Sequence, residues 1–106
     1  MQYQIEKQQE SLVVELKDLT VDLSFVSNEL GDDYKHLILD LSAFAEVSGD
    51  KLKNFTNFGK NVVGNNSFVI ICQMEFSEEF PIVPTLQEAF DVIELEEIER
   101  QLDLDF

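Results

Sequence analysis

The sequence predicts an α/β domain built on one mixed, mostly parallel sheet of about five strands with three to four helices. Apolar runs of strand length alternate along the chain with segments whose apolar residues recur every three or four positions, as in βαβ units. Residues 36–42 and 67–73 are apolar through their middle, which is typical of strands covered on both faces. At 106 residues the chain suits one core, so we expect a single domain over residues 1–106, with residues 102–106 frayed.

The first half of the chain predicts a hairpin, a helix and a buried strand. Residues 3–7 and 12–17 carry β-formers, and residues 8–11 separate them, so the two segments favour an opening hairpin. Leu19, Leu23, Val26 and Leu30 are spaced 4, 3 and 4, which predicts one face of an amphipathic helix. Gly31 is the expected stop of this helix, and the strand over residues 36–42 follows.

The second half predicts another helix, two strands and a closing helix. Leu52, Phe55, Phe58 and Val62 indicate a helix that ends at residues 64–66. A strand over residues 67–73 follows, then a loop over residues 74–79 and a short strand over residues 80–83. We interpret the glycines at positions 31, 49, 59 and 64 as helix caps and loop residues.

The closing helix has a clear start. Pro84 cannot extend a strand ladder, and Thr85 with Glu88 forms the T-x-x-E capping box that opens a helix, which we expect to reach about Leu102. Its apolar residues predict an inward stripe, made of Leu86, Ala89, Phe90 and Ile93 and continued by Leu95, Ile98 and Leu102. Leu104 and Phe106 alternate with acids at the end of the chain, where a frayed terminus and an anchor for a basic groove are two open interpretations.

The formal net charge of −15, from 22 acidic against seven basic residues, limits the choice of partner. Nucleic acid and anionic membranes are poor partners because phosphates repel such a surface. A protein with a basic surface fits better, while simple solubility is the alternative explanation. No apolar run approaches the roughly 18 residues that cross a bilayer, and residues 1–7 do not resemble a signal peptide. The single cysteine, Cys72, fits a reducing cytoplasm, and we expect a monomer or weak dimer.

Residues for catalysis or metal binding are scarce. His36 is the only histidine, and Cys72 lies at the end of a core strand, where cysteine usually behaves as a small hydrophobe. A zinc site needs several such ligands, and Asp32–Asp33 do not belong to a calcium-loop motif. Glycine-rich phosphate loops are also missing from the sequence. We therefore expect a non-enzymatic protein without a cofactor or a bound metal.

The loop that follows residues 36–42 is the candidate binding site. Val47, Ser48, Gly49, Asp50 and Lys51 lie between the carboxyl end of a central strand and the start of a helix, where open α/β sheets place functional groups. Helix amides at this point also favour an anion, so Ser48 is a candidate phosphoacceptor. The alternative, which local chemistry favours, is that Ser48 or Asp50 caps the helix.

Three segments resemble STAS domains, the fold of bacterial anti-sigma factor antagonists. Residues 36–42, HLILDLS, are similar to the central strand of the family, and residues 67–73 are similar to the next strand. Residues 84–90, PTLQEAF, and residues 96–100, EEIER, are similar to its closing helix. The resemblance covers nearly the whole chain and implies a single STAS-like domain that binds another protein.

The likeness departs from the family at its phospho-switch loop. Antagonists that act as switches carry Asp-Ser-Ser-Gly-Leu there, whereas this chain has Ser48-Gly49-Asp50-Lys51-Leu52. The position of the phosphorylated serine falls on Gly49, so the resemblance implies a binding module without the usual serine switch. Since some STAS domains hold nucleotides or lipids, a small-ligand or nucleotide-binding domain is the alternative.

The chain also resembles small acidic proteins of Bacteroidetes-type genomes, some of which carry the name ribonuclease Z. That nuclease needs a histidine-rich di-zinc centre. Because this chain has only His36, we do not expect the activity here.

Overall fold

The computed structural model describes residues 3–8, 10–20, 22–30, 34–44, 46–73 and 81–104. The described elements are, in chain order, β1 (Tyr3–Gln8), β2 (Ser11–Leu16), α1 (Phe25–Leu30), β3 (His36–Asp40), α2 (Gly49–Val63), β4 (Phe68–Ile71), β5 (Ile82–Val83) and α3 (Leu86–Leu104). The expectations for Gly31, Asp32–Asp33, the loop over residues 74–79, Phe80, the Leu104 side chain and Phe106 lie outside the described residues.

The five strands form one mixed sheet in the order β1-β2-β3-β4-β5. β1 pairs antiparallel with β2 in the predicted hairpin, with Tyr3 opposite Leu16 and Gln8 opposite Ser11. The β2–β3, β3–β4 and β4–β5 pairs are parallel. The prediction of a mixed, mostly parallel sheet of about five strands is therefore confirmed. The described part of the chain has two long helices and the six-residue helix α1, which is fewer full-length helices than the three to four expected.

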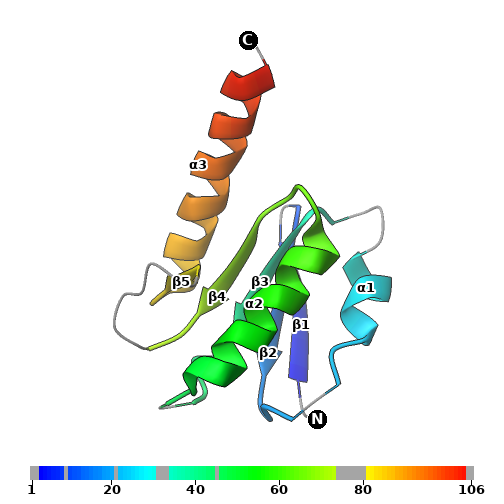
Figure 1. The fold of residues 1–106 in the computed structure, drawn as a ribbon, viewed down its shortest axis with the longest axis vertical. Coiled ribbons are helices and arrows are strands. Elements are labelled where there is room, and N and C mark those ends of the chain that lie inside the picture. Colours follow the sequence, from blue (N-terminus) through cyan, green and yellow to red (C-terminus); the bar gives the residue numbers. More distant parts are fainter. Residues whose placement is uncertain are drawn as a thin grey trace.

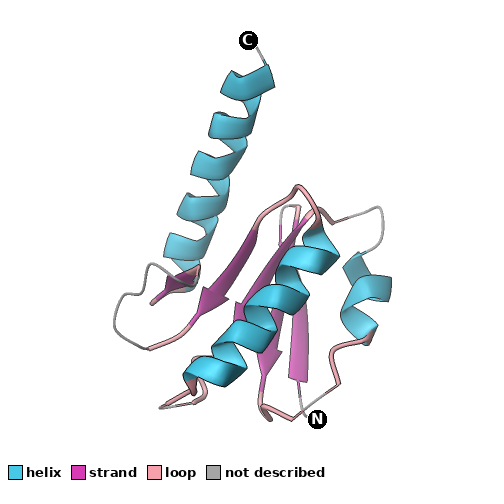
Figure 2. Ribbon diagram, viewed as in Figure 1, coloured by secondary structure: helices cyan, strands magenta, loops and turns pink. Residues whose placement is uncertain are grey.

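α1 and α2 lie over one face of the sheet (Figure 1), and α3 packs on the opposite face of the central strands. Alternate residues of each strand point to opposite faces. Leu12 of β2 and Leu37 of β3 therefore join the larger core beneath α1 and α2, whereas Val13 and Ile38 join a smaller core beneath α3. Figure 2 shows α2 lying across the sheet while α3 runs along the edge formed by β4 and β5. The central strands β3 and β4 are buried on both faces, as their continuous apolar runs predict.

The first helix is shorter than the sequence predicts. Leu19 precedes it in a turn, although the side chain of Leu19 still packs against the larger core. Asp18 accepts hydrogen bonds from the backbone N–H and hydroxyl of Thr20, and Asp22 accepts one from the backbone N–H of Ser24. These local carboxylate bonds stabilise turns instead of helical backbone. The helix therefore begins only at Phe25.

Gly59 is neither a cap nor a loop residue, so our interpretation of this glycine is wrong. It lies inside α2 and is buried. A Cβ atom at this position would approach three ring atoms of Phe68 in β4 to less than 3.0 Å. Gly64, by contrast, ends α2 with a positive φ of 60°, which glycine adopts most easily.

α3 begins as the sequence predicts, since the Thr85 hydroxyl accepts a hydrogen bond of 3.1 Å from the backbone N–H of Glu88. Its 19 residues make a helix of about 28 Å, whereas the five residues of β3 span about 17 Å. The helix is longer than the strands that it covers, and its C-terminal half projects past the sheet (Figure 1). No helix in the described part of the chain has both the length and the apolar character needed to span a membrane.

The prediction that the inward stripe continues into the second half of α3 is wrong. Ala89 and Ile93 are buried beneath α3, with Leu86 and Phe90 packed beside them. Leu95, Ile98 and Leu102 are instead 60%, 46% and 53% exposed. They lie on the opposite side of α3 from Ala89 and Ile93, which pack on the sheet, so they point away from the core.

Candidate functional site

The predicted binding loop joins β3 to α2, and its residues have different environments. Val47 is buried in the larger core, so its side chain holds the loop in place. Gly49 and Asp50 are exposed, and Lys51 is partly exposed. The part of the loop available for contact with another molecule is the first turn of α2.

Ser48 caps α2. Its backbone is extended, with φ −66° and ψ 154°, and its Oγ accepts a hydrogen bond of 3.2 Å from the backbone N–H of Lys51. The capping interpretation of Ser48 is therefore confirmed. Phosphorylation of this exposed serine stays a prediction.

A groove that sequence reasoning missed lies between α3 and the amino ends of β2 and β3. It has a volume of about 360 Å³. Its lining residues are Glu10, Ser11, His36, Gln87, Phe90, Asp91, Ile93, Glu94 and Glu97. Four carboxylates face this groove, and Lys35 and Arg100 lie at an adjoining hollow that shares Glu10 and Glu97. The groove is consequently acidic, and the positive charges of Lys35 and Arg100 lie in the adjoining hollow.

His36 links this groove to the sheet. The imidazole is 2% exposed, and its Nδ1 accepts a hydrogen bond of 3.0 Å from the backbone N–H of Ser67. Because Nδ1 is an acceptor, the ring hydrogen lies on Nε2, which is 2.5 Å from Glu97 Oε1. Arg100 adds a second link, since its Nη2 donates to the Ser67 hydroxyl over 3.1 Å. These bonds join α3 to the first residues of β3 and β4.

The same geometry limits the chemistry of His36. A general base needs a free ring lone pair directed at its substrate, but Nδ1 is occupied by Ser67 and Nε2 carries the hydrogen directed at Glu97. The imidazole is therefore best described as a buried connector between α3 and the sheet.

Glu10, His36 and Glu97 are the one set of groups suited to a metal ion among the described residues, with ligand atoms within 4.8 Å of one another. A metal on Nε2 would shift the ring hydrogen to Nδ1, where it would face the backbone N–H of Ser67. Glu10 is also paired with Lys35 at 3.7 Å. The arrangement favours the hydrogen-bonded imidazole over a metal ligand.

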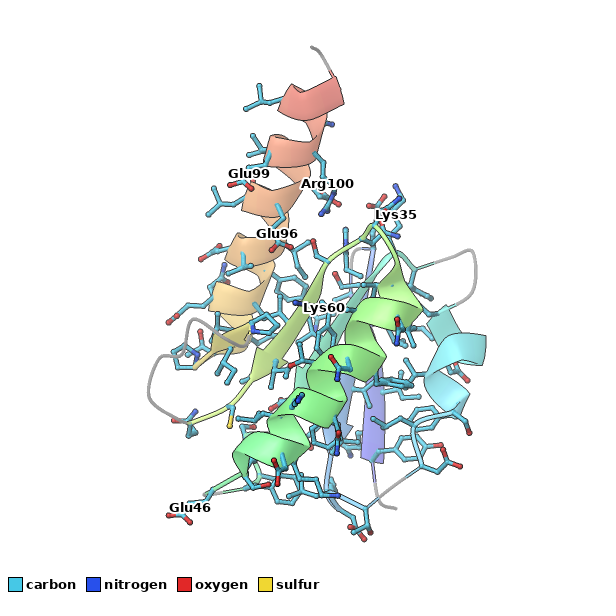
Figure 3. All side chains as sticks on the ribbon, in the orientation of Figure 1. Lys35, Glu46, Lys60, Glu96, Glu99 and Arg100 are labelled. Carbon is cyan, nitrogen blue, oxygen red and sulfur yellow. The ribbon has the colours of Figure 1, made fainter. Side chains whose placement is uncertain are left out.

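The outer face of α3 is the second feature that the sequence did not reveal. Leu95, Ile98 and Leu102 recur at spacings of three and four residues, so they lie along one side of the helix. Glu94 and Glu99 flank them, and both glutamates are exposed. We call these five residues the outer stripe of α3. In Figure 3, Glu99 lies on the side of α3 away from the sheet, while Arg100 points toward it.

Comparison with protein-family models, with curated proteins and with solved structures found no match to this chain. The features of this chain that bear on its function are the groove, the loop before α2 and the outer stripe of α3.

Proposed function

We propose that this chain is a non-enzymatic module that binds another protein with a basic surface. The observation that carries the proposal is the outer stripe of α3. Three large apolar side chains there are about half exposed, and their spacing places them in one line along the helix. The C-terminal half of this helix projects past the sheet (Figure 1). Exposed apolar residues that gather on one face, with polar residues around them, mark contact sites on protein surfaces.

The proposal includes a STAS-like fold related to that of anti-sigma factor antagonists, without the usual serine switch. The parallel β2–β3–β4 core and the α2 helix that follows the β3 loop support this comparison. At the position of the phosphorylated serine this chain has Gly49. The preceding Ser48 hydroxyl holds the first turn of α2, which is a structural role that needs no phosphate.

A small-ligand or nucleotide-binding domain is the alternative. The groove beneath α3 has the size for such a ligand, but Glu10, Asp91, Glu94 and Glu97 line it. Four carboxylates raise the Coulomb energy of any phosphate group placed among them. Charge in the groove thus favours the protein-binding proposal over an anionic ligand.

The test is affinity capture from a lysate of the source cells with the tagged chain, followed by mass spectrometry and reconstitution with the purified partner. We expect one stoichiometric partner with a basic surface. A thermal-shift screen with nucleotides runs beside it, and we expect no rise in melting temperature. A nucleotide that raises the melting temperature by several degrees, with no protein captured, would contradict the proposal.

Ser48→Asn tests the absence of a switch within the same experiment. Asparagine caps helices about as well as serine, so the variant keeps α2 intact while removing the phosphoacceptor. We expect unchanged capture of the partner. Loss of phosphate-dependent control in this variant would show that Ser48 acts as a switch after all.

A further inference from the structure

We propose that the outer stripe of α3 is one half of a two-helix interface, and that its occupant is a basic amphipathic helix of the partner protein. This inference rests on the proposed function and names the chemistry of the partner. The register of the stripe supports a two-helix interface. Leu95, Ile98 and Leu102 occupy successive a, d and a positions of a heptad, the pattern by which two helices pack against each other.

The inner side of α3 already has its own contacts, which makes the outer side the free one. In the same register Ala89 and Ile93 fall at b and f, and both are buried against the sheet. Glu97 and Arg100 fall at c and f and bond to His36 and Ser67. The helix is therefore fixed in rotation by its inner side. This holds Leu95, Ile98 and Leu102 toward solvent.

The charged residues beside the apolar seam determine which kind of partner helix can bind. The positions that flank an a/d seam are e and g, and here they hold Glu99 at e and Glu94 and Gln101 at g. Asp91, which also lines the groove beneath α3, and Glu88 continue the a/d line toward the start of α3, and both are exposed. A partner helix with Leu or Ile at its own a and d positions and Lys or Arg at e and g would satisfy both the apolar and the acidic parts of this surface.

A second copy of the chain fits poorly. In a parallel pair of α3 helices, a g residue faces the e residue five positions later on the other helix, so Glu94 would face Glu99. In an antiparallel pair each of these glutamates would face its own equivalent. Both arrangements bring like charges together at the edge of a short apolar seam, and Asp91 adds a further repulsion in the parallel case.

Synthetic peptides provide a direct test. The probe is a three-heptad helical peptide with Ile and Leu at a and d and Lys at e and g. A second peptide has Glu at e and g, and a third has the composition of the basic probe in scrambled order. Binding to the full chain is measured by fluorescence anisotropy at low and at moderate salt. We expect the basic probe to bind at least about tenfold more tightly than either control, with weaker binding at moderate salt.

Two variants of the chain assign the binding to the outer stripe. Leu95→Gln, Ile98→Gln and Leu102→Gln together remove the apolar seam but retain good helix formers at exposed positions. We expect this triple variant to lose at least about tenfold in affinity for the basic probe. Glu94→Lys with Glu99→Lys should reverse the preference toward the acidic peptide. Glu6→Lys with Glu46→Lys changes the net charge equally at exposed positions outside α3, and we expect it to keep the preference for the basic probe.

The outcomes separate this inference from the proposed function. Equal binding of the scrambled peptide, or unchanged binding by the triple variant, would overturn the inference because attraction would then come from net charge alone. A dimer that light scattering detects in the wild-type chain and that the triple variant abolishes would overturn it in favour of a second copy. If the cellular partner is captured equally by the triple variant, the inference is wrong while the proposed function stands. If the wild-type chain captures no partner, the proposed function itself is wrong.

Discussion

Replacing Gly59 by alanine tests the packing of α2 on the sheet. Alanine is a better helix former than glycine by about 1 kcal/mol, so helix propensity alone predicts stabilisation. The structure predicts the opposite, because the new methyl group would lie within 3.0 Å of the Phe68 ring. Phe68 is only 5% exposed, and its ring is enclosed by the larger core. The Phe68 ring can move only if the neighbouring core side chains move as well.

The size of the effect follows from these two opposing contributions. Overpacking a core costs about 1–3 kcal/mol, and the upper end applies because three ring atoms are approached at once. After subtraction of the propensity gain, we expect Gly59→Ala to lower the free energy of unfolding by about 2 kcal/mol. In a domain of this size, that corresponds to a fall in melting temperature of roughly 8 °C.

Urea denaturation followed by circular dichroism measures this change, and Gly49→Ala is the matched control. Gly49 is the first residue of α2, where the gain for helix interiors applies only in part, and a Cβ there meets no atom within 4 Å. We therefore expect no loss of stability and a gain of at most about 1 kcal/mol. Phe68→Leu in the Gly59→Ala background should recover part of the loss by making room, with a coupling of about 1 kcal/mol. If Gly59→Ala is as stable as the wild type, or more stable, the packing argument is refuted.

Two further predictions concern hydrogen bonds that involve carboxylates. Glu97→Ala removes the acceptor of the buried His36 Nε2–H. The variant should lower the free energy of unfolding by about 1 kcal/mol. This is the lower end of the usual cost of leaving a buried donor without a partner, because water can enter the groove. The control Glu99→Ala, on the exposed side of α3, should change the midpoint of urea denaturation very little. The Thr20 hydroxyl and then the Thr20 amide lower the pKa of Asp18 below its ordinary value. The stability that this carboxylate contributes is therefore present above its unfolded pKa and lost as the pH falls through its folded pKa. Thr20→Val should raise the Asp18 pKa in an NMR titration, and an unchanged titration would show that the hydroxyl bond is not its main cause.

Local sequence signals predicted the strands and most helix ends because their causes are local. The apolar runs that became β3 and β4 need cover on both faces wherever they lie in the fold. Ser48 and Thr85 cap α2 and α3 through bonds to residues three positions ahead. The start of α1 was predicted too early for a related reason. Asp18 and Asp22 form turns with residues two positions ahead, and the spacing of apolar residues contains no information about such bonds.

The sequence by itself determined the mixed α/β sheet, the caps and the strongly acidic surface, all of which follow from composition and from contacts between near neighbours. Only the tertiary structure decided which side chains meet across long separations. His36 bonds to Glu97 across 61 residues of chain, and Gly59 packs on Phe68 because α2 crosses β4. It also decided that Leu95, Ile98 and Leu102 face solvent. Periodicity shows that these residues share a side of α3, but only the packing of the opposite side on the sheet, through Ala89 and Ile93, decides that this side faces solvent.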